Sequence, residues 1–388
     1  MQTHPRRLLV FTGHFYPHPQ SGGLEKYVEE LYSRLAATGK YRVTIVTFEA
    51  GSAREEVYRG LQVVRLEEWF SIAGVFTVPT PQSLSRFRRE VLPSLKPDIV
   101  VTQTRFFPAA LVGALLARQQ GIPHLHTEHG SDYVRHASAI VSGGAWLWDS
   151  LFGRFILRSA KRVTGVSSGV KDFVYRLAGR EAVVAYNGVD IDFWDPALAR
   201  QLPTDLVRWL KGRKPFLYVG RLMRVKGYEV LIEAVRGLSL AEQKKIAIVL
   251  VGSGPEEARM KQLIHDYGLE HVIRALGRQS PELVRDLLAV SIYVNPSFSA
   301  EGLQTTLLEA GAMNSWLITT DVSGAREVVS EPGIGEVVAQ QDVAAFQASM
   351  QRALRDSLES QARASIIRRF GWPALVTQFD AILESMSA

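Results

Sequence analysis

The sequence predicts an α/β protein made of two doubly wound domains, each built on a parallel sheet. Three observations support this prediction. The chain of 388 residues is too long for one ordinary hydrophobic core and fits two domains of roughly 150–200 residues each. Short apolar runs alternate with amphipathic stretches along the whole chain, as strands alternate with helices in this fold class. The alternation restarts near residue 187, so we expect two successive sheets.

In the first half, short continuous apolar runs predict strands that are buried on both faces of a parallel sheet. Between them, residues 24–37 and 109–120 carry apolar side chains three and four positions apart, which is typical of amphipathic helices. The predicted strands are residues 8–12, 43–47, 99–102, 124–127, 163–166 and 182–186.

The second half repeats this alternation after a turn signal at residues 187–190 and a polar connector with a short helix at 195–215. We therefore expect an N-terminal domain over 1–186, a C-terminal domain over 187–370 and a final amphipathic segment over 371–388. The predicted strands of the second half are residues 216–219, 247–251, 272–275, 292–294, 316–319 and 335–338.

Composition narrows the class of protein. With 46% hydrophobic and 22% charged residues the chain is typical of soluble globular proteins, and no apolar run reaches the roughly 18–20 residues of a membrane span. The chain contains no cysteine, which excludes disulfides and thiolate chemistry. The apolar run after Arg7 is too short for a signal peptide and has no small-residue cleavage site, so we expect a cytoplasmic protein.

The net charge of +6 is unevenly distributed. Residues 1–190 hold 23 Lys and Arg against 16 Asp and Glu, whereas residues 191–388 hold 22 against 23. A basic half can meet nucleic acid, an anionic membrane or an acidic acceptor, or it can carry solvated arginines without a partner. No nucleic-acid motif is present, so we expect no nucleic-acid partner. Peripheral contact with the inner face of an anionic membrane stays open.

One aromatic segment bears on that question. Residues 146–158 combine Trp146, Trp148 and Phe152 with Arg154 and Arg158. Such a stretch is either a core helix or an element that lies in a bilayer surface. A loop expected at residues 69–76 carries further aromatic side chains in the same half.

Glycine-rich turns follow several predicted strands. Gly22 and Gly23 would let a ligand approach the backbone before the first helix, although a plain flexible loop explains them as well. In the second half, one glycine turn is followed by Arg221 and Lys226, two cations that could hold a diphosphate or be ordinary surface residues. The glycine turn at 251–256 is a third, weaker motif.

Glu301 and Glu309 occupy the segment with the clearest chemistry. Glu301 lies in a Ser/Gly-rich turn, and Glu309 lies about one turn inside the helix expected after it. The amide groups at the start of that helix suit a phosphate, and the carboxylates suit sugar hydroxyls. A nucleotide-sugar offers both groups in one ligand.

One histidine and a pair of aspartates are further candidate site residues. His129, in the sequence His-Thr-Glu-His-Gly at 126–130, ends a strand and could donate to a sugar hydroxyl or be a satisfied polar residue. Zinc-binding spacings of the H-E-x-x-H kind are absent. Asp190 and Asp192 match a metal-binding D-x-D pattern, but their place at a boundary favours a turn.

In their order along the chain, these motifs resemble the retaining glycosyltransferases of family 4, also called glycosyl transferases group 1. The resemblance covers essentially the whole chain. It implies the GT-B architecture, in which two Rossmann-like domains face each other across a cleft and a C-terminal helix crosses back to the first domain. The matching residues are Gly22, Gly23, Glu25, His129, Gly130, Asn187, Asp190, Gly220, Arg221, Lys226, Gly227, Gly252, Gly254, Glu256, Glu301, Gly302, Glu309, Glu327, Phe370, Gly371 and Trp372.

The resemblance also implies roles for individual residues. Arg221 and Lys226 would grip the donor diphosphate, and Glu309 would bind the ribose hydroxyls. His129 and Glu301 would be the catalytic residues beside the transferred sugar. The remaining donor-binding positions are Gly22, Gly23, Gly302, Leu303, Gln304 and Thr305.

The implied reaction moves a sugar from a nucleotide-sugar to a glycan, a lipid-linked or a small-molecule acceptor and keeps the anomeric configuration. A UDP-linked donor is the first expectation and a GDP-linked donor the second. No metal or other cofactor is expected, because cationic side chains would stabilise the leaving diphosphate. The rival hypotheses are another two-Rossmann nucleotide-sugar enzyme, such as an epimerase or an inverting transferase, and a non-catalytic sensor of nucleotide-sugars.

The chain departs from the family pattern at three places. Leu303 and Gln304 replace Phe-Gly beside the sugar pocket, which leaves the sugar open. Trp316 replaces a proline before a strand. Arg326 also stands at a usual proline, where it would contact donor or acceptor or be a surface residue.

Overall fold

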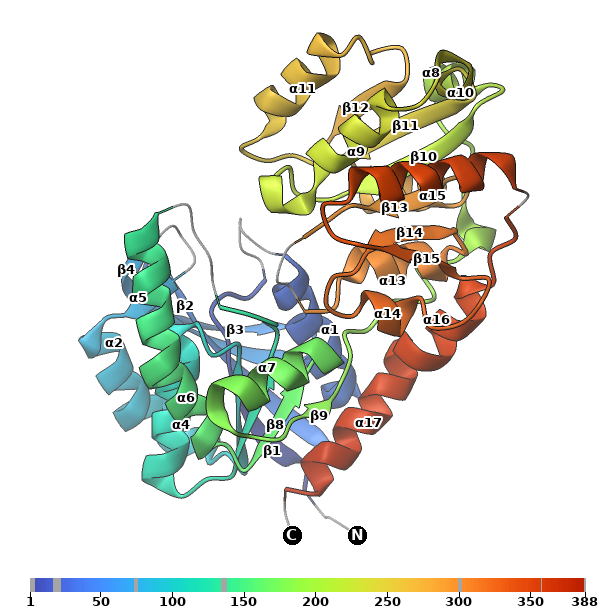
Figure 1. The fold of residues 1–388 in the computed structure, drawn as a ribbon. Helices are drawn as coiled ribbons and strands as arrows, with labels where there is room; N and C mark the ends of the chain where they lie inside the picture. Colours follow the sequence, from blue (N-terminus) through green and yellow to red (C-terminus); the bar gives the residue numbers. More distant parts are fainter. Residues whose placement is uncertain are drawn as a thin grey trace. The chain divides into compact units, whose positions relative to one another are not determined.

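The computed structural model describes residues 4–16, 22–72, 76–133, 138–298, 302–356 and 358–386. Contacts divide the chain into two compact units (Figure 1). The first comprises Met1–Asn187, Ala300–Leu303 and Pro373–Ala388, and the second comprises Gly188–Ser299 and Gln304–Trp372. Each unit is an α/β layer structure around a sheet, which confirms the predicted fold class.

The first unit is built on a nine-stranded sheet in the order β3-β4-β2-β1-β6-β7-β8-β9, with β5 paired to β4. The strands from β4 to β9 along this path run parallel, whereas β3 and β5 are antiparallel to β4. The strands are β1 (Arg6–Phe11), β2 (Tyr41–Glu49), β3 (Arg54–Tyr58), β4 (Leu61–Ile72), β5 (Phe76–Pro79), β6 (Ile99–Gln103), β7 (His124–Glu128), β8 (Arg162–Gly165) and β9 (Val183–Val184).

Helices connect these strands and cover the sheet. The helices of the first unit are α1 (Gly23–Ala37), α2 (Pro81–Arg86), η1 (Phe87–Val91), α3 (Leu92–Leu95), α4 (Pro108–Gln120), α5 (Ala139–Trp148), η2 (Asp149–Gly153), α6 (Arg154–Ser159), α7 (Ser168–Ala178) and α17 (Trp372–Glu384). Side chains of β1 such as Leu9 and Phe11 are at most 1% exposed, because both faces of the central strands are covered.

The final helix α17 packs on the first unit, as the sequence predicted. Phe379 is 2% exposed and meets the ring of Tyr32 edge-to-face, with ring centroids 6.1 Å apart. Asp380 accepts hydrogen bonds from Lys40 Nζ at 2.6 Å and from the Tyr41 hydroxyl at 2.5 Å. Gln378 Nε2 donates to the carbonyl of Val184 at 2.8 Å. Apolar burial and polar contacts therefore hold this helix against the rest of the first unit.

The second unit is built on a six-stranded parallel sheet in the order β12-β11-β10-β13-β14-β15. Its first strand in the chain, β10, lies between β11 and β13, so the connections turn in opposite directions on either side of β10. The strands are β10 (Lys214–Val219), β11 (Ile246–Val251), β12 (Ile273–Gly277), β13 (Ile292–Asn295), β14 (Leu317–Thr320) and β15 (Gly335–Val338).

Helices of the second unit surround this sheet, and a cluster of buried apolar side chains that includes Ile248, Val294 and Phe346 forms its core. The helices are η3 (Pro196–Leu198), α8 (Thr204–Leu210), η4 (Arg224–Lys226), α9 (Tyr228–Arg236), α10 (Leu240–Gln243), α11 (Glu257–Asp266), α12 (Pro281–Leu288), α13 (Thr305–Ala312), α14 (Ala325–Val328), α15 (Val343–Arg355) and α16 (Ala362–Phe370).

The expectation of a loop at residues 69–76 was wrong. Trp69–Ile72 form the end of β4 and Phe76 begins β5, with Ile72 paired to Phe76 in an antiparallel ladder. The register shifts between Glu68 and Phe70, which interrupts the alternation of side chains between the two faces of the sheet. The sequence pattern that is typical of a strand is therefore lost there.

Among the helices in the described part of the chain, none combines the length and the apolar character that crossing a membrane requires.

The docking of α17 leads to a first prediction. We expect Phe379→Ala to lower the free energy of unfolding by about 3–5 kcal/mol, because it removes a buried aromatic ring from the first unit. Urea denaturation followed by circular dichroism measures the change. Thr377→Ala on the exposed face of the same helix is the control and should stay within about 0.5 kcal/mol of the wild type. Equal free energies of unfolding for the two variants would show that the packing of Phe379 contributes little to stability.

Candidate functional site

In the first unit, the predicted site residues gather at the carboxyl edge of the parallel strands. His129 directly follows β7, and Gln103 ends the neighbouring strand β6. Gly22 is the N-cap of α1, which follows β1 on the other side of β6, and its amide donates to Glu25 Oε2 at 2.7 Å. Ligands of open α/β sheets bind at this kind of edge.

His129 is held in one orientation by neighbours on two elements, β6 and α1. Gln103 donates through Nε2 to the Tyr32 hydroxyl at 2.9 Å, so its Oε1 faces His129 Nε2, also at 2.9 Å. The ring of Tyr27 contacts the imidazole edge-to-face at 4.8 Å between centroids. An amide oxygen only accepts, so the neutral imidazole carries its proton on Nε2 and presents Nδ1 as an acceptor.

Burial lowers the pKa of His129 to about 4, although the carboxylate of Glu128 opposes the shift. The ring is therefore neutral at pH 7. We expected His129 to donate to a sugar hydroxyl. With the Nε2 proton engaged by Gln103, the geometry instead suits acceptance of a hydroxyl proton at Nδ1.

The buried carboxylate of Glu128 fixes the backbone around His129. Its Oε1 accepts from the amides of His129 at 2.9 Å and Gly130 at 2.8 Å and lies 3.0 Å from Arg105 NH1. Its Oε2 lies 3.3 Å from His126 Nε2. Burial alone would raise the pKa of Glu128, but Arg105 and the hydrogen bonds outweigh it and hold that pKa well below the usual range.

Arg105 connects this carboxylate to a second one. Its guanidinium donates to Asp149 Oδ2 at 2.9 Å and to the carbonyl of Asp132 at 3.0 Å, and it lies 4.3 Å from the ring centroid of Phe173. Arg105 and Asp149 are at most 2% exposed as side chains. The ion pairs therefore form in a dry environment, where loss of one partner leaves a buried charge uncompensated.

Gly302 and Leu303, predicted to bind the donor, belong to the first unit by their contacts. Asn187 Nδ2 donates to the carbonyl of Leu303 at 2.8 Å. A β-carbon added at Gly302 would lie 2.5 Å from the carbonyl oxygen of His129, so only glycine fits there. The structure thus brings the turn at His129 and the turn at Gly302 together, although 172 residues lie between them in the sequence. Glu301 lies outside the described residues.

In the second unit, the loop after β10 occupies the topological switch point of the sheet. This loop carries Arg221, which is exposed, and Lys226, which is half-buried. Its backbone is bonded to the neighbouring strand ends: Leu222 N donates to the carbonyl of Ser253 at 2.9 Å, and Phe298 N donates to that of Val225 at 2.9 Å. The cationic loop is therefore fixed on both sides of β10.

Gly227 makes this close approach of loops possible. Its φ is +74°, and a β-carbon would lie 1.9 Å from the carbonyl oxygen of Pro296 in the loop after β13. A side chain at this position would combine backbone strain with a direct clash. The glycine sets the position of Lys226, which precedes it.

Helix α13 begins on the other side of the switch point. Gln304 is its N-cap and Thr305 its first residue, so the first-turn amides lie at the carboxyl edge of the sheet. The side chain of Gln304 is buried and accepts a hydrogen bond from Asn295 Nδ2. Glu309 is half-buried in the second turn, as predicted. The arrangement offers cations, helix amides and a carboxylate along one edge.

Three further positions have partners within the second unit. Arg326 is exposed and forms a bidentate pair with Asp321, at 3.0 and 2.8 Å. Trp316 packs against the core of the second unit. Asp190 Oδ1 accepts from the amide of Asp192 at 3.1 Å, which is the predicted turn role.

Sequence reasoning missed the residues that support the site. Glu128 stood inside the His-Thr-Glu-His-Gly motif, where a carboxylate after a buried strand could have drawn attention. Arg105 and Asp149 carried no such signal, since they are isolated in the sequence and meet only through the fold.

Comparison with known families agrees with this geometry. The model of "Glycosyltransferase Family 4" matches residues 21–193, and the model of "Glycosyl transferases group 1" matches residues 207–369. The two matches together span most of the chain. An uncharacterised glycosyltransferase of Methanocaldococcus jannaschii is 26% identical, with 98% of both chains covered.

Solved structures share the fold. Sucrose-phosphate synthase from Thermosynechococcus elongatus superposes with a TM-score of 0.76 at 20% identity, covering 98% of this chain and 99% of that one. HepE of Anabaena in complex with UDP and glucose gives a TM-score of 0.73 at 18% identity, covering 98% and 100%. The two doubly wound units are thus those of the GT-B fold.

The buried network leads to a second prediction, on stability and pH. Because the folded-state pKa of Glu128 lies below its ordinary value of 4.5, its stabilising effect is present above about pH 4.5 and is lost as the pH falls further. We expect Glu128→Gln to cost about 3–5 kcal/mol at pH 7, because Arg105 loses a buried partner. The difference from the wild type should shrink toward pH 4.

Urea denaturation at pH 7 and pH 4 tests this prediction. Glu181→Gln is the matched control, since that side chain is 76% exposed and the same change is made. A stability difference for Glu128→Gln that did not vary with pH would contradict the proposed ionisation of the buried carboxylate.

Proposed function

The chain belongs to the group 1 glycosyltransferases, and we propose that it is a retaining member that uses a UDP-linked sugar without a metal ion. The observation that carries the proposal is the switch point of the second sheet. There the Arg221–Lys226 loop, fixed by Gly227, lies on one side of β10, and helix α13 begins after the adjacent strand β13. The cations and the helix amides suit a diphosphate, and the carboxylate of Glu309 suits a ribose.

The diphosphate would be bound by charge and by helix amides. Arg221 offers a planar guanidinium fork and Lys226 a compact ammonium, and both suit phosphate oxygens. The first-turn amides of α13, at Thr305 and the residues after it, add partial positive charge at the same edge. These groups would stabilise the negative charge that develops on the leaving phosphate, which is the part that a metal ion plays elsewhere.

The nucleoside would be held through Glu309, whose carboxylate can accept from both ribose hydroxyls. The structure of Anabaena HepE with UDP and glucose shows that this fold accommodates a uridine nucleotide in that protein. We extend the uridine preference to this chain as part of the proposal, with a GDP-linked donor as the second candidate.

In the proposed reaction, the bond between the sugar's anomeric carbon and the diphosphate oxygen breaks while a bond to the acceptor oxygen forms on the same face. The leaving phosphate oxygen takes the proton of the acceptor hydroxyl, so the products are the glycoside and UDP. Transfer therefore keeps the anomeric configuration. The acceptor is a hydroxyl of a glycan, a lipid-linked or a small-molecule substrate.

His129 would orient the transferred sugar. Its neutral ring can accept a sugar hydroxyl at Nδ1 while Gln103 holds Nε2. Glu301, the other catalytic residue expected from the sequence, would contact the same sugar. A neutral imidazole adds no cationic charge beside the anomeric carbon, where positive charge develops in glycosyl transfer.

A third prediction concerns Lys226. We expect Lys226→Ala to lower kcat by about 10²–10³-fold, because the leaving diphosphate loses a positioned cation. UDP release from the donor in the presence of an acceptor measures the rate. Lys211→Ala, at an exposed lysine of the same unit, should leave the rate unchanged. Wild-type activity of the Lys226→Ala variant would show that Lys226 does not belong to the donor site.

A fourth prediction concerns the donor and the stereochemistry. In a thermal-shift panel of UDP-, GDP- and ADP-sugars, a UDP-sugar at about 100 times its Kd should raise the Tm by roughly 5–10 °C, because a ligand that binds only the folded state stabilises it. NMR of the product made with that donor should show the donor's anomeric configuration. A selective response to GDP-sugars would correct the base, and an inverted product would exclude the retaining reaction.

A further inference from the structure

Helix α5 is a surface helix that contains no charged side chain from Ala139 to Trp148. Ile140 is 87% exposed, Trp146 55% and Leu147 52%. The helix continues without a break through the π-helical turn η2 into α6, and Leu151 in that turn is 56% exposed. A helix that is apolar on its outer face is ordinarily buried or lies in a membrane surface.

The end of the β4–β5 hairpin extends this surface. Trp69 is 66% and Ile72 57% exposed, and Ile72 pairs with Phe76 across the hairpin. The Phe76 ring contacts that of Trp148 at 4.8 Å between centroids, so the hairpin packs against α5. We call this surface the apolar face, and its residues are Trp69, Phe70, Ile72, Ile140, Val141, Trp146, Leu147, Leu151 and Phe152.

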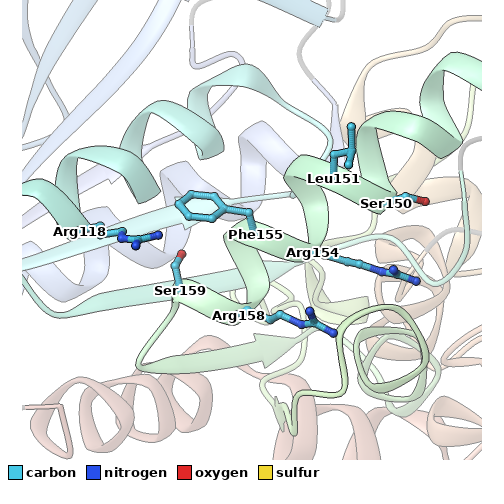
Figure 2. Close-up of a pocket in the computed structure, with 7 residues that line it drawn as sticks. All are labelled: Arg118, Ser150, Leu151, Arg154, Phe155, Arg158 and Ser159. Carbon is cyan, nitrogen blue, oxygen red and sulfur yellow. The ribbon is translucent and has the colours of Figure 1, made fainter.

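A basic pocket lies where the apolar face ends. It is an open hollow of about 460 Å³ lined by Arg118, Ser150, Leu151, Arg154, Phe155, Arg158 and Ser159. In Figure 2 the Phe155 ring lies between the Arg118 guanidinium on one side and Arg154 and Arg158 on the other. Leu151 belongs to both surfaces, so the apolar face and the pocket are continuous.

The three arginines of the pocket have no acidic neighbour among the described residues that line it. Arg154 and Arg158 donate through Nε to the carbonyls of Leu177 at 2.8 Å and Ala178 at 3.0 Å, at the end of α7. Anchoring through Nε holds each side chain in place and leaves the terminal nitrogens for another acceptor. Three like charges in one pocket favour an anion with several oxygens, and a phosphate fits this requirement.

We propose that the apolar face and the basic pocket together dock the protein on a membrane surface that contains anionic phospholipid. The apolar face enters the boundary between headgroups and acyl chains, and the pocket receives a lipid phosphate. This interaction is separate from the donor site in the second unit.

Charge complementarity favours a membrane over a second copy of the chain as the partner. A second copy would have to bring acidic groups against the three arginines and apolar groups against α5 in the same spacing. An anionic bilayer presents phosphates over its whole surface, with acyl chains directly beneath them.

Flotation with lipid vesicles tests the proposal on the full-length protein. Wild-type protein should bind vesicles of phosphatidylcholine with about 30% phosphatidylglycerol and should stay unbound with phosphatidylcholine alone, because binding depends on anionic headgroups. Leu147→Asp and Arg118→Glu should each weaken binding at least tenfold. Arg118 is chosen because its side chain makes no hydrogen bond within the described structure, whereas Arg154 and Arg158 help to cap α7.

Matched controls come from the second unit. Leu240→Asp changes an aliphatic side chain that is 73% exposed, and Arg208→Glu reverses the charge of an exposed arginine. Both should bind vesicles as the wild type does. All four variants should keep the wild-type melting temperature, which separates a loss of docking from a loss of folding.

Three outcomes would overturn the proposal. The first is no binding of the wild type to anionic vesicles, and the second is unchanged binding of Leu147→Asp and Arg118→Glu. The third is a wild-type dimer in analytical ultracentrifugation that Leu147→Asp converts to a monomer, with no vesicle binding by either protein. That result would make this surface an interface between copies.

Competition with inorganic phosphate distinguishes a lipid phosphate from a free one. A tenfold excess of inorganic phosphate over lipid should not release the protein from the vesicles. Release would show that the pocket is a site for free phosphate.

Discussion

The buried ion pair between Arg105 and Glu128 is the interaction on which the functional edge of the first unit depends. Glu128 uses its oxygens to fix the amides of His129 and Gly130, and Arg105 compensates its charge. Without Arg105, a carboxylate in this position would be too costly to keep ionised. The orientation of His129 and the glycine contact at residue 302 follow from that fixed backbone.

The second unit reaches comparable order by other means. Its cationic loop is fixed by main-chain hydrogen bonds to the strand ends on both sides of β10. At the start of α13, neutral amide side chains of Asn295 and Gln304 meet, and Asn295 also donates to Thr319 at 2.9 Å. The start of α13 is therefore held by neutral groups, whereas the buried edge of the first unit is held by charged ones.

The sequence alone predicted the parallel strands well, because their continuous apolar runs reflect burial on both faces. It missed one parallel strand, β4, whose second half is mostly exposed. It also missed β3, whose residues are mostly polar and exposed, and β5, which has four residues and an irregular pairing with β4. The turn that carries Arg221 and Lys226 and the helix that carries Glu309 were predicted because turn and helix signals are local, and the binding roles of these residues stay predictions. Arg105 and Asp149 could not be recognised, since 44 positions separate them and only tertiary folding makes them partners.

The first unit is discontinuous in the chain, because Pro373–Ala388 completes it after the whole second unit has been made. During synthesis at about 5–20 residues per second, the surface that receives α17 stays uncovered for roughly ten to forty seconds. Tyr32 and Tyr41 lie in that surface and gain their partners Phe379 and Asp380 only at the end. The nascent protein therefore exposes this surface until its own last helix has been made and covers it.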